Sequence, residues 1–348
     1  MSAMVQPRGL AVLPTYQCTA RCEQCCVAGE PGSTARLGLD EILSFIEEGS
    51  TFPSVRLVTF SGGECFLLGA KLVGAVAFAS GKGLKTRCVT NGYWAKTMSQ
   101  GRRRLQRLKD AGLSELNIST GDRHQQWVSE EAVVNAACLG VESGLDSTLI
   151  SVELQKERHV TMARLLDNRR LRQLYQNQAQ TRFRIIESPW MPMRASATIA
   201  QAPESLFGRD TVHAAGGCKR MFTTVVLTPQ RRIGFCCGLS RELIPELNGE
   251  LRGHSLAELL ESAGTDFMKI WIFVDGPQRI LAWAATKDPR IVWERRYAHH
   301  CHACLAVFQD PLARRTIAAH YRERVHDVLV RYSLVLRNQE LQPATAPP

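Results

Sequence analysis

Residues 14–25 have the sequence PTYQCTARCEQC, which sets Cys18, Cys22 and Cys25 in the spacing C-x3-C-x2-C. A structural zinc site takes four ligands and commonly uses C-x2-C pairs, so this loop fits zinc poorly. Three cysteines in one short loop can instead hold three irons of a 4Fe–4S cluster, which leaves the fourth iron without a protein ligand. The alternative is a loop of reduced thiols in a cytosolic protein. The segments downstream favour the cluster.

A second motif, Gly62-Gly63-Glu64, closes a β-branched apolar stretch at 55–60. Two glycines at the end of a strand let the backbone approach a ligand closely, and the glutamate adds an acceptor. The next apolar stretch ends in the sequence T-N-G at 90–92. That segment is either a ligand contact at the mouth of a barrel or an ordinary Asn-Gly turn.

The first half of the chain alternates apolar stretches typical of buried strands with stretches of helical spacing. The predicted strands are 9–14, 55–60, 84–89, 115–119, 148–154 and 182–187. The predicted helices include 39–48, 70–80, 98–111 and 162–176. Such alternation predicts an α/β fold with a parallel sheet and outer helices. Six units are too few for an eight-fold barrel. Ligands bind at the carboxyl ends of parallel strands, which is where the motifs fall.

The cysteine spacing and the G-G-E segment resemble those of the radical S-adenosylmethionine enzymes. The resemblance implies a partial (β/α)6 barrel. It implies that Cys18, Cys22 and Cys25 hold a 4Fe–4S cluster whose open iron binds S-adenosylmethionine. Reductive cleavage of this cofactor would give a 5′-deoxyadenosyl radical that abstracts hydrogen from the substrate. Gln24 departs from the family, in which an aromatic residue often precedes the third cysteine.

The same resemblance implies further contacts with the cofactor. Gly62, Gly63 and Glu64 would receive the amino group of its methionine moiety. Ser119, and next Asp122, would touch its ribose and carboxylate at the end of the fourth strand. The nearby His124 is either an acid or base or, more commonly for such a position, a structural loop histidine.

A second set of cysteines lies in the C-terminal half. Cys218 precedes a predicted hairpin that ends at Cys236 and Cys237, and Cys301 and Cys304 form a C-x2-C pair. Four such ligands can hold zinc or an iron–sulfur cluster. The layout resembles the twitch subdomain, a shortened SPASM extension, which implies one auxiliary 4Fe–4S cluster. Either Cys236 or Cys237 completes the set of four ligands, and the distance from Cys218 and the hairpin layout favour Cys236. Cys237 could instead be a free thiol near the substrate that gives up a hydrogen atom.

These features predict three parts. Residues 1–192 form the partial barrel, 193–311 a small α+β twitch-like iron–sulfur domain, and 312–348 a C-terminal helix and disordered tail. The last helix is predicted from about 310 to 337. The final residues, 342–348, are rich in proline and alanine and predict disorder.

The composition is that of an ordinary globular protein, with 348 residues of which 45% are hydrophobic. No apolar run is long enough to span a bilayer, and the N-terminus lacks the apolar core of a signal peptide. Twelve cysteines in such a chain favour metal or redox use over disulfides. We therefore expect a cytoplasmic protein without a membrane partner.

The chain has 43 basic and 33 acidic residues, a net charge of +10. That charge suits nucleic acid, acidic peptides or anionic small molecules, although solvated helix faces explain such charge as well. The expected substrate is a ribosomally made peptide, and the alternative is dehydrogenation of a small alcohol or aminosugar. A remote alternative is a non-enzymatic zinc or nucleic-acid-binding protein. Expected partners are an electron donor such as flavodoxin or ferredoxin and, since only 17 residues precede Cys18, a separate peptide-recognition protein.

Overall fold

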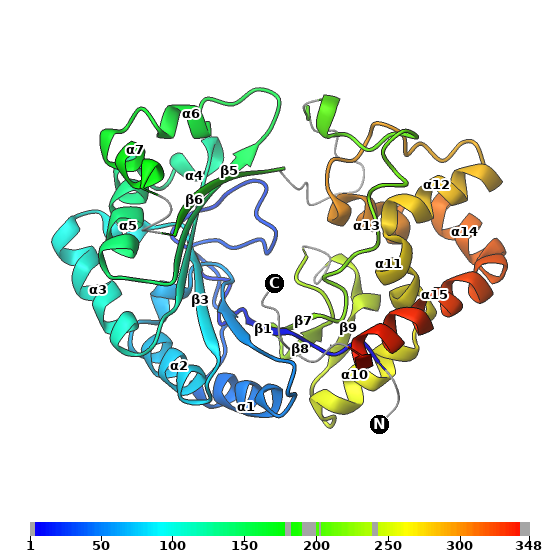
Figure 1. Cartoon of the computed structure of the whole chain (residues 1–348), viewed down its shortest axis with the longest axis horizontal. Coiled ribbons are helices and arrows are strands. Elements are labelled where there is room, and N and C mark those ends of the chain that lie inside the picture. The colour runs from blue at the N-terminus through cyan, green and yellow to red at the C-terminus, as the bar shows by residue number, and fades with distance from the viewer. Residues whose placement is uncertain (1–3, 178–181, 190–199, 202, 239–242, 342–348) are drawn as a thin grey trace. The chain divides into compact units, whose positions relative to one another are not determined.

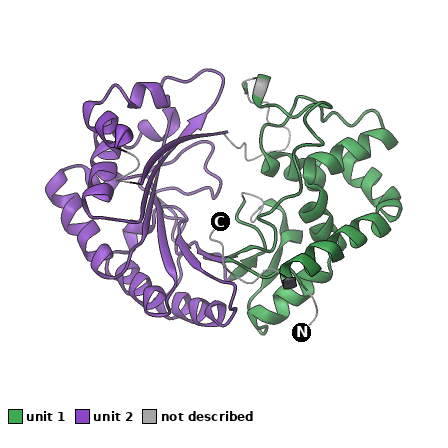
Figure 2. Cartoon of the chain, in the orientation of Figure 1, with its two compact units in different colours: residues 1–8, 191–226, 232–348 green, residues 9–190, 227–231 purple. Residues whose placement is uncertain are grey.

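The computed structural model describes residues 4–177, 182–189, 200–201, 203–238 and 243–341. The chain divides into two compact units, shown in different colours in Figure 2. We call residues 9–190 with 227–231 the N-terminal unit, and residues 1–8, 191–226 and 232–348 the C-terminal unit. The boundary predicted at 192/193 lies outside the described residues. The segment predicted as a separate part, 312–348, is grouped with the C-terminal unit.

The N-terminal unit is built on six strands in the spatial order β6-β5-β4-β3-β2-β1, and every adjacent pair is parallel. The strands are β1 (Gly9–Val12), β2 (Leu57–Phe60), β3 (Lys85–Thr90), β4 (Glu115–Thr120), β5 (Ser147–Leu154) and β6 (Phe183–Pro189). β1 and β6 stand at opposite ends of this run, so the sheet is open, in agreement with a partial barrel. The predicted parallel sheet is confirmed.

Within the described residues, seven helices connect these strands. They are α1 (Leu39–Ser50), α2 (Ala70–Gly81), α3 (Met98–Asp110), α4 (Asp122–Gln125), α5 (Glu130–Glu142), α6 (Met162–Leu165) and α7 (Arg169–Gln176), with short 3-10 turns η1 (Cys65–Leu68) and η2 (Tyr93–Ala95). The single helix predicted over 162–176 is wrong. Thr161 accepts a hydrogen bond from the Arg164 N–H, and Asn168 accepts one from the Arg170 N–H. Each side chain caps its own helix, because such oxygens satisfy the free N–H groups of a first turn.

The strands bury one face against these helices. Helices α1, α2, α3, α5 and α7 lie along one side of the sheet (Figure 1). Along β3, β4 and β5, buried residues alternate with less buried ones. The buried residues are those that face the helices. We call the face opposite the helices the inner face. Phe45, Phe60 and Trp94 are among the largest fully buried side chains of this core, each worth about 1.5–3 kcal/mol of burial.

The C-terminal unit combines short strands with a group of helices. The strands β7 (Thr224–Leu227), β8 (Arg232–Gly234) and β9 (Asn248–Glu250) neighbour one another in that order, with short turns η3 (Pro203–Ser205) and η4 (Pro245–Leu247). The helices among its described residues are α10 (Leu256–Thr265), α11 (Phe267–Asp275), α12 (Pro277–Lys287), α13 (His300–Gln309), α14 (Pro311–His320) and α15 (Arg322–Leu341). The single last helix predicted from 310 is wrong, since the chain breaks at Tyr321 into α14 and α15.

Buried Asp275 fixes α15 to the rest of the C-terminal unit. Its carboxylate accepts hydrogen bonds from Arg331 at 2.7 Å, from the Trp271 indole at 2.8 Å and from Arg324 at 3.5 Å. Burial alone would raise the pKa of Asp275, but the bonds from Arg331 and Trp271 hold it below its usual value. The C-terminal helix is therefore attached by charge-assisted hydrogen bonds as well as by packing.

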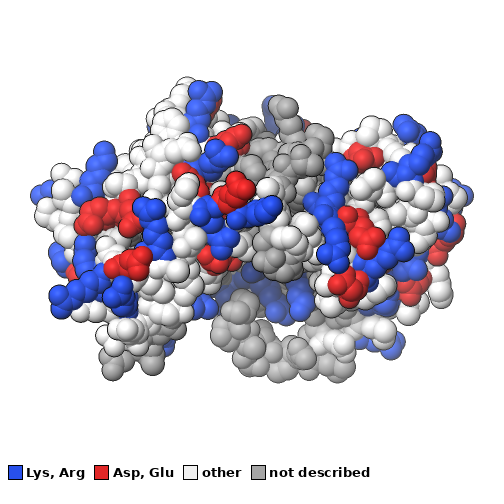
Figure 3. All heavy atoms as spheres, turned by 90° about the horizontal axis from the view of Figure 1, so that it is seen from above, with Lys and Arg blue, Asp and Glu red and all other residues white. Residues whose placement is uncertain are grey.

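The surface carries charges of both signs. On the face seen in Figure 3, lysine and arginine side chains are interspersed with aspartate and glutamate. No helix in the described part of the chain has the length and apolarity that crossing a membrane requires.

Candidate functional site

The loop that carries the first three cysteines is held against the carboxyl end of β2. The Gly63 N–H donates to the Thr15 carbonyl at 2.8 Å, and the Glu64 N–H donates to the Gln17 carbonyl at 2.9 Å. The Cys18 N–H in turn donates to the Glu30 carbonyl at 3.1 Å, which ties the start of the loop to its return. The two sequence motifs are therefore one structural unit.

The two glycines of the motif allow this close approach. Gly62 has a φ of +103°, and a Cβ atom there would lie 2.5 Å from the Thr15 carbonyl oxygen. A Cβ atom on Gly63 would lie 2.6 Å from the Tyr16 carbonyl oxygen and closer still to that of Gln17. Ordinary side chains keep such contacts at 3.4–4 Å. The backbone that needs the space is thus the protein's own cysteine loop.

Several N–H groups point at the cysteine sulfurs. The Ala20 N–H donates to the Cys18 sulfur at 3.4 Å, and the Gly29 N–H donates to the Cys25 sulfur at 3.2 Å. The Asn91 amide also donates to Cys18, at 3.6 Å. Hydrogen bonds to sulfur stabilise negative charge there and tune the reduction potential of iron–sulfur clusters. The donor pattern therefore suits cysteines that work as thiolates.

In the protein without metal, the thiols of Cys18 and Cys22 hold their protons firmly. Burial raises the pKa of Cys18 to about 11. Burial and the neighbouring Cys25 raise the pKa of Cys22 to about 12, and Glu153 contributes to the same shift. The Cys22 thiol accordingly donates to the Arg123 carbonyl, at 3.8 Å. Binding of a metal must displace these protons.

Glu64 is fully buried and joins β2 to β3. Its carboxylate accepts hydrogen bonds from the Phe66 N–H at 3.1 Å, the Thr90 hydroxyl at 2.8 Å and the Asn91 N–H at 2.9 Å. Burial raises the pKa of Glu64 to about 7, although these hydrogen bonds act in the opposite direction. Because protein donors already occupy much of the carboxylate, Glu64 positions the T-N-G segment. Its predicted contact with a methionine amino group stays a prediction.

The T-N-G segment at 90–92 is built into the same network. The Thr90 hydroxyl also accepts hydrogen bonds from the Gly92 N–H and from the Trp94 indole, at 3.1 and 3.0 Å. Asn91 reaches both Cys18 and the Thr19 hydroxyl with its amide. Sequence reasoning left this segment undecided between a site and a turn. The structure shows that it supports the cysteine loop.

The residues predicted at the end of β4 have different surroundings. Asp122 accepts hydrogen bonds from the N–H groups of His159 and Val160, the shortest at 2.7 Å, and so holds the loop after β5. His124 pairs with Glu153, with 3.2 Å between Nδ1 and Oε1. Ser119 lies on the inner face of β4, opposite Ser151 of β5. The predicted cofactor contacts of Ser119 and Asp122 remain predictions.

The C-terminal unit brings the other four predicted cysteines together. Burial raises the pKa of Cys304 far above its usual value, and the proximity of Cys236, Cys301 and Cys218 adds to the shift. Cys236 is buried and close to Cys218 as well, whereas Cys237 is exposed. The structure thus places Cys236 in this group and turns Cys237 outward. All twelve cysteines lie in the described residues, and none of them forms a disulfide.

Local structure explains how these four cysteines meet. A Cβ atom on Gly217 would lie 2.7 Å from the Val274 carbonyl oxygen and closer to that of Phe273, so only glycine lets Cys218 approach the end of α11. Its N–H donates to the Ile272 carbonyl at 3.0 Å. Cys301 lies in the first turn of α13, whose positive end favours a thiolate.

Histidines lie beside the Cys301–Cys304 pair in the sequence. His302 is buried against Tyr297, with ring centroids 4.7 Å apart. His299 caps α13 by accepting from the Cys301 N–H at 3.1 Å, and burial lowers its pKa to about 4. Both therefore shape the start of the helix that carries Cys301 and Cys304.

Residues 12–120 match the family model described as the Radical SAM superfamily. This part of the chain is similar to a radical SAM domain. The superfamily uses a 4Fe–4S cluster and S-adenosylmethionine, and the matched range contains the first three cysteines, the G-G-E motif and Ser119.

Two kinds of relative accompany this match. The chain is 23% identical over 119 residues to the putative peptide biosynthesis protein YydG of Bacillus subtilis (strain 168), and the match covers 34% of this chain and 37% of YydG. The structure of native anSMEcpe with bound AdoMet and Kp18Cys peptide superposes with a TM-score of 0.54 and 13% identity, covering 95% of this chain and 99% of anSMEcpe. Streptococcus suis SuiB bound to S-adenosylmethionine has a TM-score of 0.44 and 13% identity, covering 75% of this chain and 66% of SuiB. The likeness to anSMEcpe shows a shared fold.

Cys18, Cys22 and Cys25 fit a cluster better than a single ion. In the part of the chain that the structure describes, no three His, Cys, Asp or Glu side chains converge as ligands of one metal ion. An iron–sulfur cluster distributes its thiolate ligands over several iron atoms, so those ligands stand further apart. The N–H groups that donate to Cys18 and Cys25 also suit the thiolates of such a cluster.

The sequence did not reveal the residues that support Cys18 and Cys25. Asn91 and Gly29 both donate to sulfur, but neither belongs to the cysteine motif. Asn91 lies in the T-N-G segment, and its place at a strand end was the available signal. Gly29 had only its position in a glycine-rich loop. Until the fold is known, neither signal shows whether the residue supports the cysteines or only forms a turn.

Proposed function

We propose that this protein is an enzyme that cleaves S-adenosylmethionine reductively and uses the resulting radical to modify a ribosomally made peptide. The observation that carries the proposal is the convergence at Cys18. Its sulfur accepts hydrogen bonds from the Ala20 N–H and the Asn91 amide, and Asn91 is itself held by the buried Glu64. Such a supported thiol at the end of a parallel sheet suits a reactive centre better than a simple structural role.

In this proposal Cys18, Cys22 and Cys25 hold a 4Fe–4S cluster. S-adenosylmethionine bound to such a cluster supplies a 5′-deoxyadenosyl radical when the cluster is reduced. The protein contributes a fixed thiolate geometry, because Gly62 and Gly63 let the loop lie against β2. The inner face of the sheet, which includes Ser119, would receive the cofactor and the substrate.

The four cysteines of the C-terminal unit would hold an auxiliary 4Fe–4S cluster of the twitch type. Cys218, Cys236 and Cys301 lie close enough to Cys304 to add to the rise in its pKa, and Cys236 adds in the same way to the raised pKa of Cys218. Such a cluster would accept an electron from the substrate or organise this unit. Zinc also binds sets of four thiolates, so metal analysis distinguishes a zinc site from a cluster.

A peptide is the substrate class with the better support. YydG is described as a putative peptide biosynthesis protein, and anSMEcpe was crystallised with a peptide. Flavodoxin or ferredoxin would supply electrons, in the cytoplasm, and a separate protein could present the peptide. Turnover of a free small alcohol or aminosugar without any peptide would support the dehydrogenase alternative instead.

The proposal is tested with anaerobically reconstituted full-length protein, S-adenosylmethionine and dithionite. We expect 5′-deoxyadenosine from the wild type and none above background from Cys25→Ala. Cys26→Ala is the matched control, because it removes the adjacent thiol and should retain both iron and cleavage. Equal 5′-deoxyadenosine from the wild type and Cys25→Ala would refute the assignment of the cluster loop.

A further inference from the structure

The inner face of the sheet differs from a hydrophobic core. A parallel sheet buried on both faces has nearly continuous apolar strands. In β4 and β5, buried residues alternate instead with half-buried ones, and the buried residues all lie on the helix side. The inner-face positions of β4 and β5 include Asn117, Ser119, Leu149 and Ser151, which are only half-buried. Polar half-buried residues in such rows are suited to contact a ligand.

Three basic side chains project from the inner face of strands β1–β6. Lys85 pairs with Asp146 at 2.7 Å, and Arg87 donates to Glu115 at 2.6 Å. The third, Arg184 of β6, is exposed and has no hydrogen bond or ion pair with any residue that the structure describes. Arg184 is thus the inner-face cation whose charge the described residues leave uncompensated.

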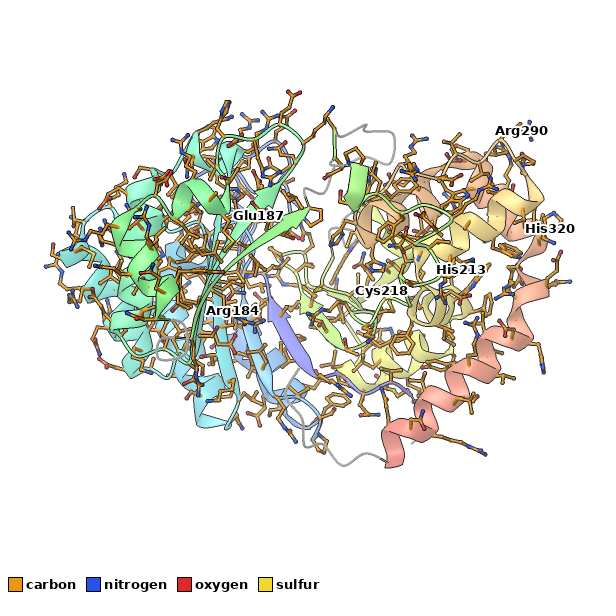
Figure 4. All side chains as sticks on the ribbon, turned by 45° about the horizontal axis from the view of Figure 1, so that its top comes forward. Arg184, Glu187, His213, Cys218, Arg290 and His320 are labelled. Carbon is orange, nitrogen blue, oxygen red and sulfur yellow. The ribbon has the colours of Figure 1, made fainter. Side chains whose placement is uncertain are left out.

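Glu187 of the same strand does not supply the missing charge. It lies three residues further along β6, on the other side of the strand (Figure 4). Its carboxylate accepts from Arg158 at 3.2 Å and from the Met162 N–H at 3.2 Å. Glu187 therefore forms its hydrogen bonds on the helix side of β6, and Arg184 lies on the opposite side of the strand.

The strand register gives Arg184 a defined set of neighbours. Leu149 lies directly opposite on β5, and Ile186, two residues along, is 44% exposed. Ile186 pairs with Ser151, which in turn pairs with Ser119. The row Ile186–Ser151–Ser119 therefore lies about 7 Å further along the strands than the row that contains Arg184. This row ends at Ser119, a predicted cofactor contact. A ligand at Arg184 would meet a cation, apolar side chains and hydroxyl groups.

We propose that Arg184 binds a carboxylate of the substrate, carried on an aliphatic chain that packs on Ile186 and Leu149. The inference rests on the proposed peptide-modifying function and names an acidic residue as the group recognised. Arginine suits this task, because its planar guanidinium matches a carboxylate with two hydrogen bonds. Loss of such a charge-assisted contact typically weakens binding by about 10- to 100-fold.

The carboxylate of S-adenosylmethionine has the same chemistry, so the experiment needs two arms. In the first, reconstituted full-length protein is titrated with acetyl-Leu-Glu-Leu-amide and with acetyl-Leu-Gln-Leu-amide, which differ only in one charge. In the second, S-adenosylmethionine is titrated without peptide. The variants are Arg184→Gln, Arg184→Lys and the control Arg103→Gln. Arg103 is an exposed arginine of α3, on the helix side of the sheet.

We expect the wild type and Arg103→Gln to bind the Glu peptide about 10-fold or more tightly than the Gln peptide. Arg184→Gln should bind both equally, and Arg184→Lys should keep part of the preference. The affinity for S-adenosylmethionine should be the same in all four proteins. Equal binding of the two peptides by the wild type, or binding of neither, overturns the inference. A weakened affinity for S-adenosylmethionine in Arg184→Gln also overturns it, because the cofactor would then be the partner.

Failure of this inference is distinct from failure of the proposed function. Wild-type protein that releases 5′-deoxyadenosine but shows no preference for the Glu peptide refutes the role of Arg184 alone. Wild-type protein that holds iron but releases no 5′-deoxyadenosine refutes the proposed function, whatever the peptide titration shows.

Discussion

Replacement of Gly63 by alanine should disrupt the site of Cys18, Cys22 and Cys25 and leave the cysteine site of the C-terminal unit intact. The new Cβ atom would lie 2.6 Å from the Tyr16 carbonyl oxygen, roughly 0.8 Å closer than the shortest ordinary contact of 3.4 Å. The obstructing atoms are backbone atoms, so they cannot rotate away. The loop before Cys18 must move, and the hydrogen bond from the Glu64 N–H to the Gln17 carbonyl is lost with it. Overpacking and the lost hydrogen bonds together should cost about 3 kcal/mol.

The assay combines urea unfolding of the iron-free protein with iron counting after anaerobic reconstitution. Gly63→Ala should lose the iron of the first cluster, about four atoms per chain, and keep that of the C-terminal unit. Gly81→Ala is the control, because its Cβ atom at the end of α2 meets nothing within 4 Å. A Gly63→Ala protein with unchanged iron and a stability within about 0.5 kcal/mol of the wild type would refute the close-approach argument.

Three further predictions follow from single residues. Cys236→Ala should remove the metal of the C-terminal unit and Cys237→Ala should not, as iron analysis of each variant would show; loss of metal only in Cys237→Ala would reverse the assignment. Burial raises the pKa of Glu64 from 4.5 to about 7, so its contribution to the unfolding free energy is complete below the unfolded pKa and declines as pH rises. Urea unfolding of the iron-free protein should show that the free energy of unfolding falls by about 3 kcal/mol as the pH rises from 4.5 to about 7. Glu64→Gln should lack this fall, and an equal fall in both proteins would contradict the prediction. The lowered pKa of Asp275 acts oppositely, since its contribution is present at neutral pH and lost on acidification through the folded pKa. Asp275→Asn should lower the free energy of unfolding by about 2 kcal/mol at neutral pH, a modest value because solvent screens arginine partners that are about a third exposed. An equal loss in acid would argue against the ion pairs.

The sequence predicts the sheet well because its signals are local and strong. Apolar runs such as 84–89 and 115–119 match β3 and β4 within one residue. Helix division is harder to predict. The break at Tyr321 has no proline or glycine to mark it, and in the structure Tyr321 packs against Phe267, which is distant in the sequence. Tertiary contacts of this kind override helical spacing.

The candidate site shows the same limit. Spacing selects six of the seven proposed ligand cysteines, and burial distinguishes Cys236 from Cys237 only once the fold is known. Glu64 was identified by its motif, but its bonds to Thr90 and Asn91 depend on the adjacency of β2 and β3. Arg184 has no sequence signal, because an arginine in a strand becomes informative only when its face and neighbours are fixed.

The most direct test of the account is the iron and sulfide content of the reconstituted protein. Wild type should be compared with a triple variant in which Cys18, Cys22 and Cys25 are alanine. Two 4Fe–4S clusters predict about eight irons per chain in the wild type and about four in the variant. About four irons in the wild type and none in the variant would contradict the auxiliary cluster. Zinc without iron would contradict the central claim that this chain is a radical enzyme.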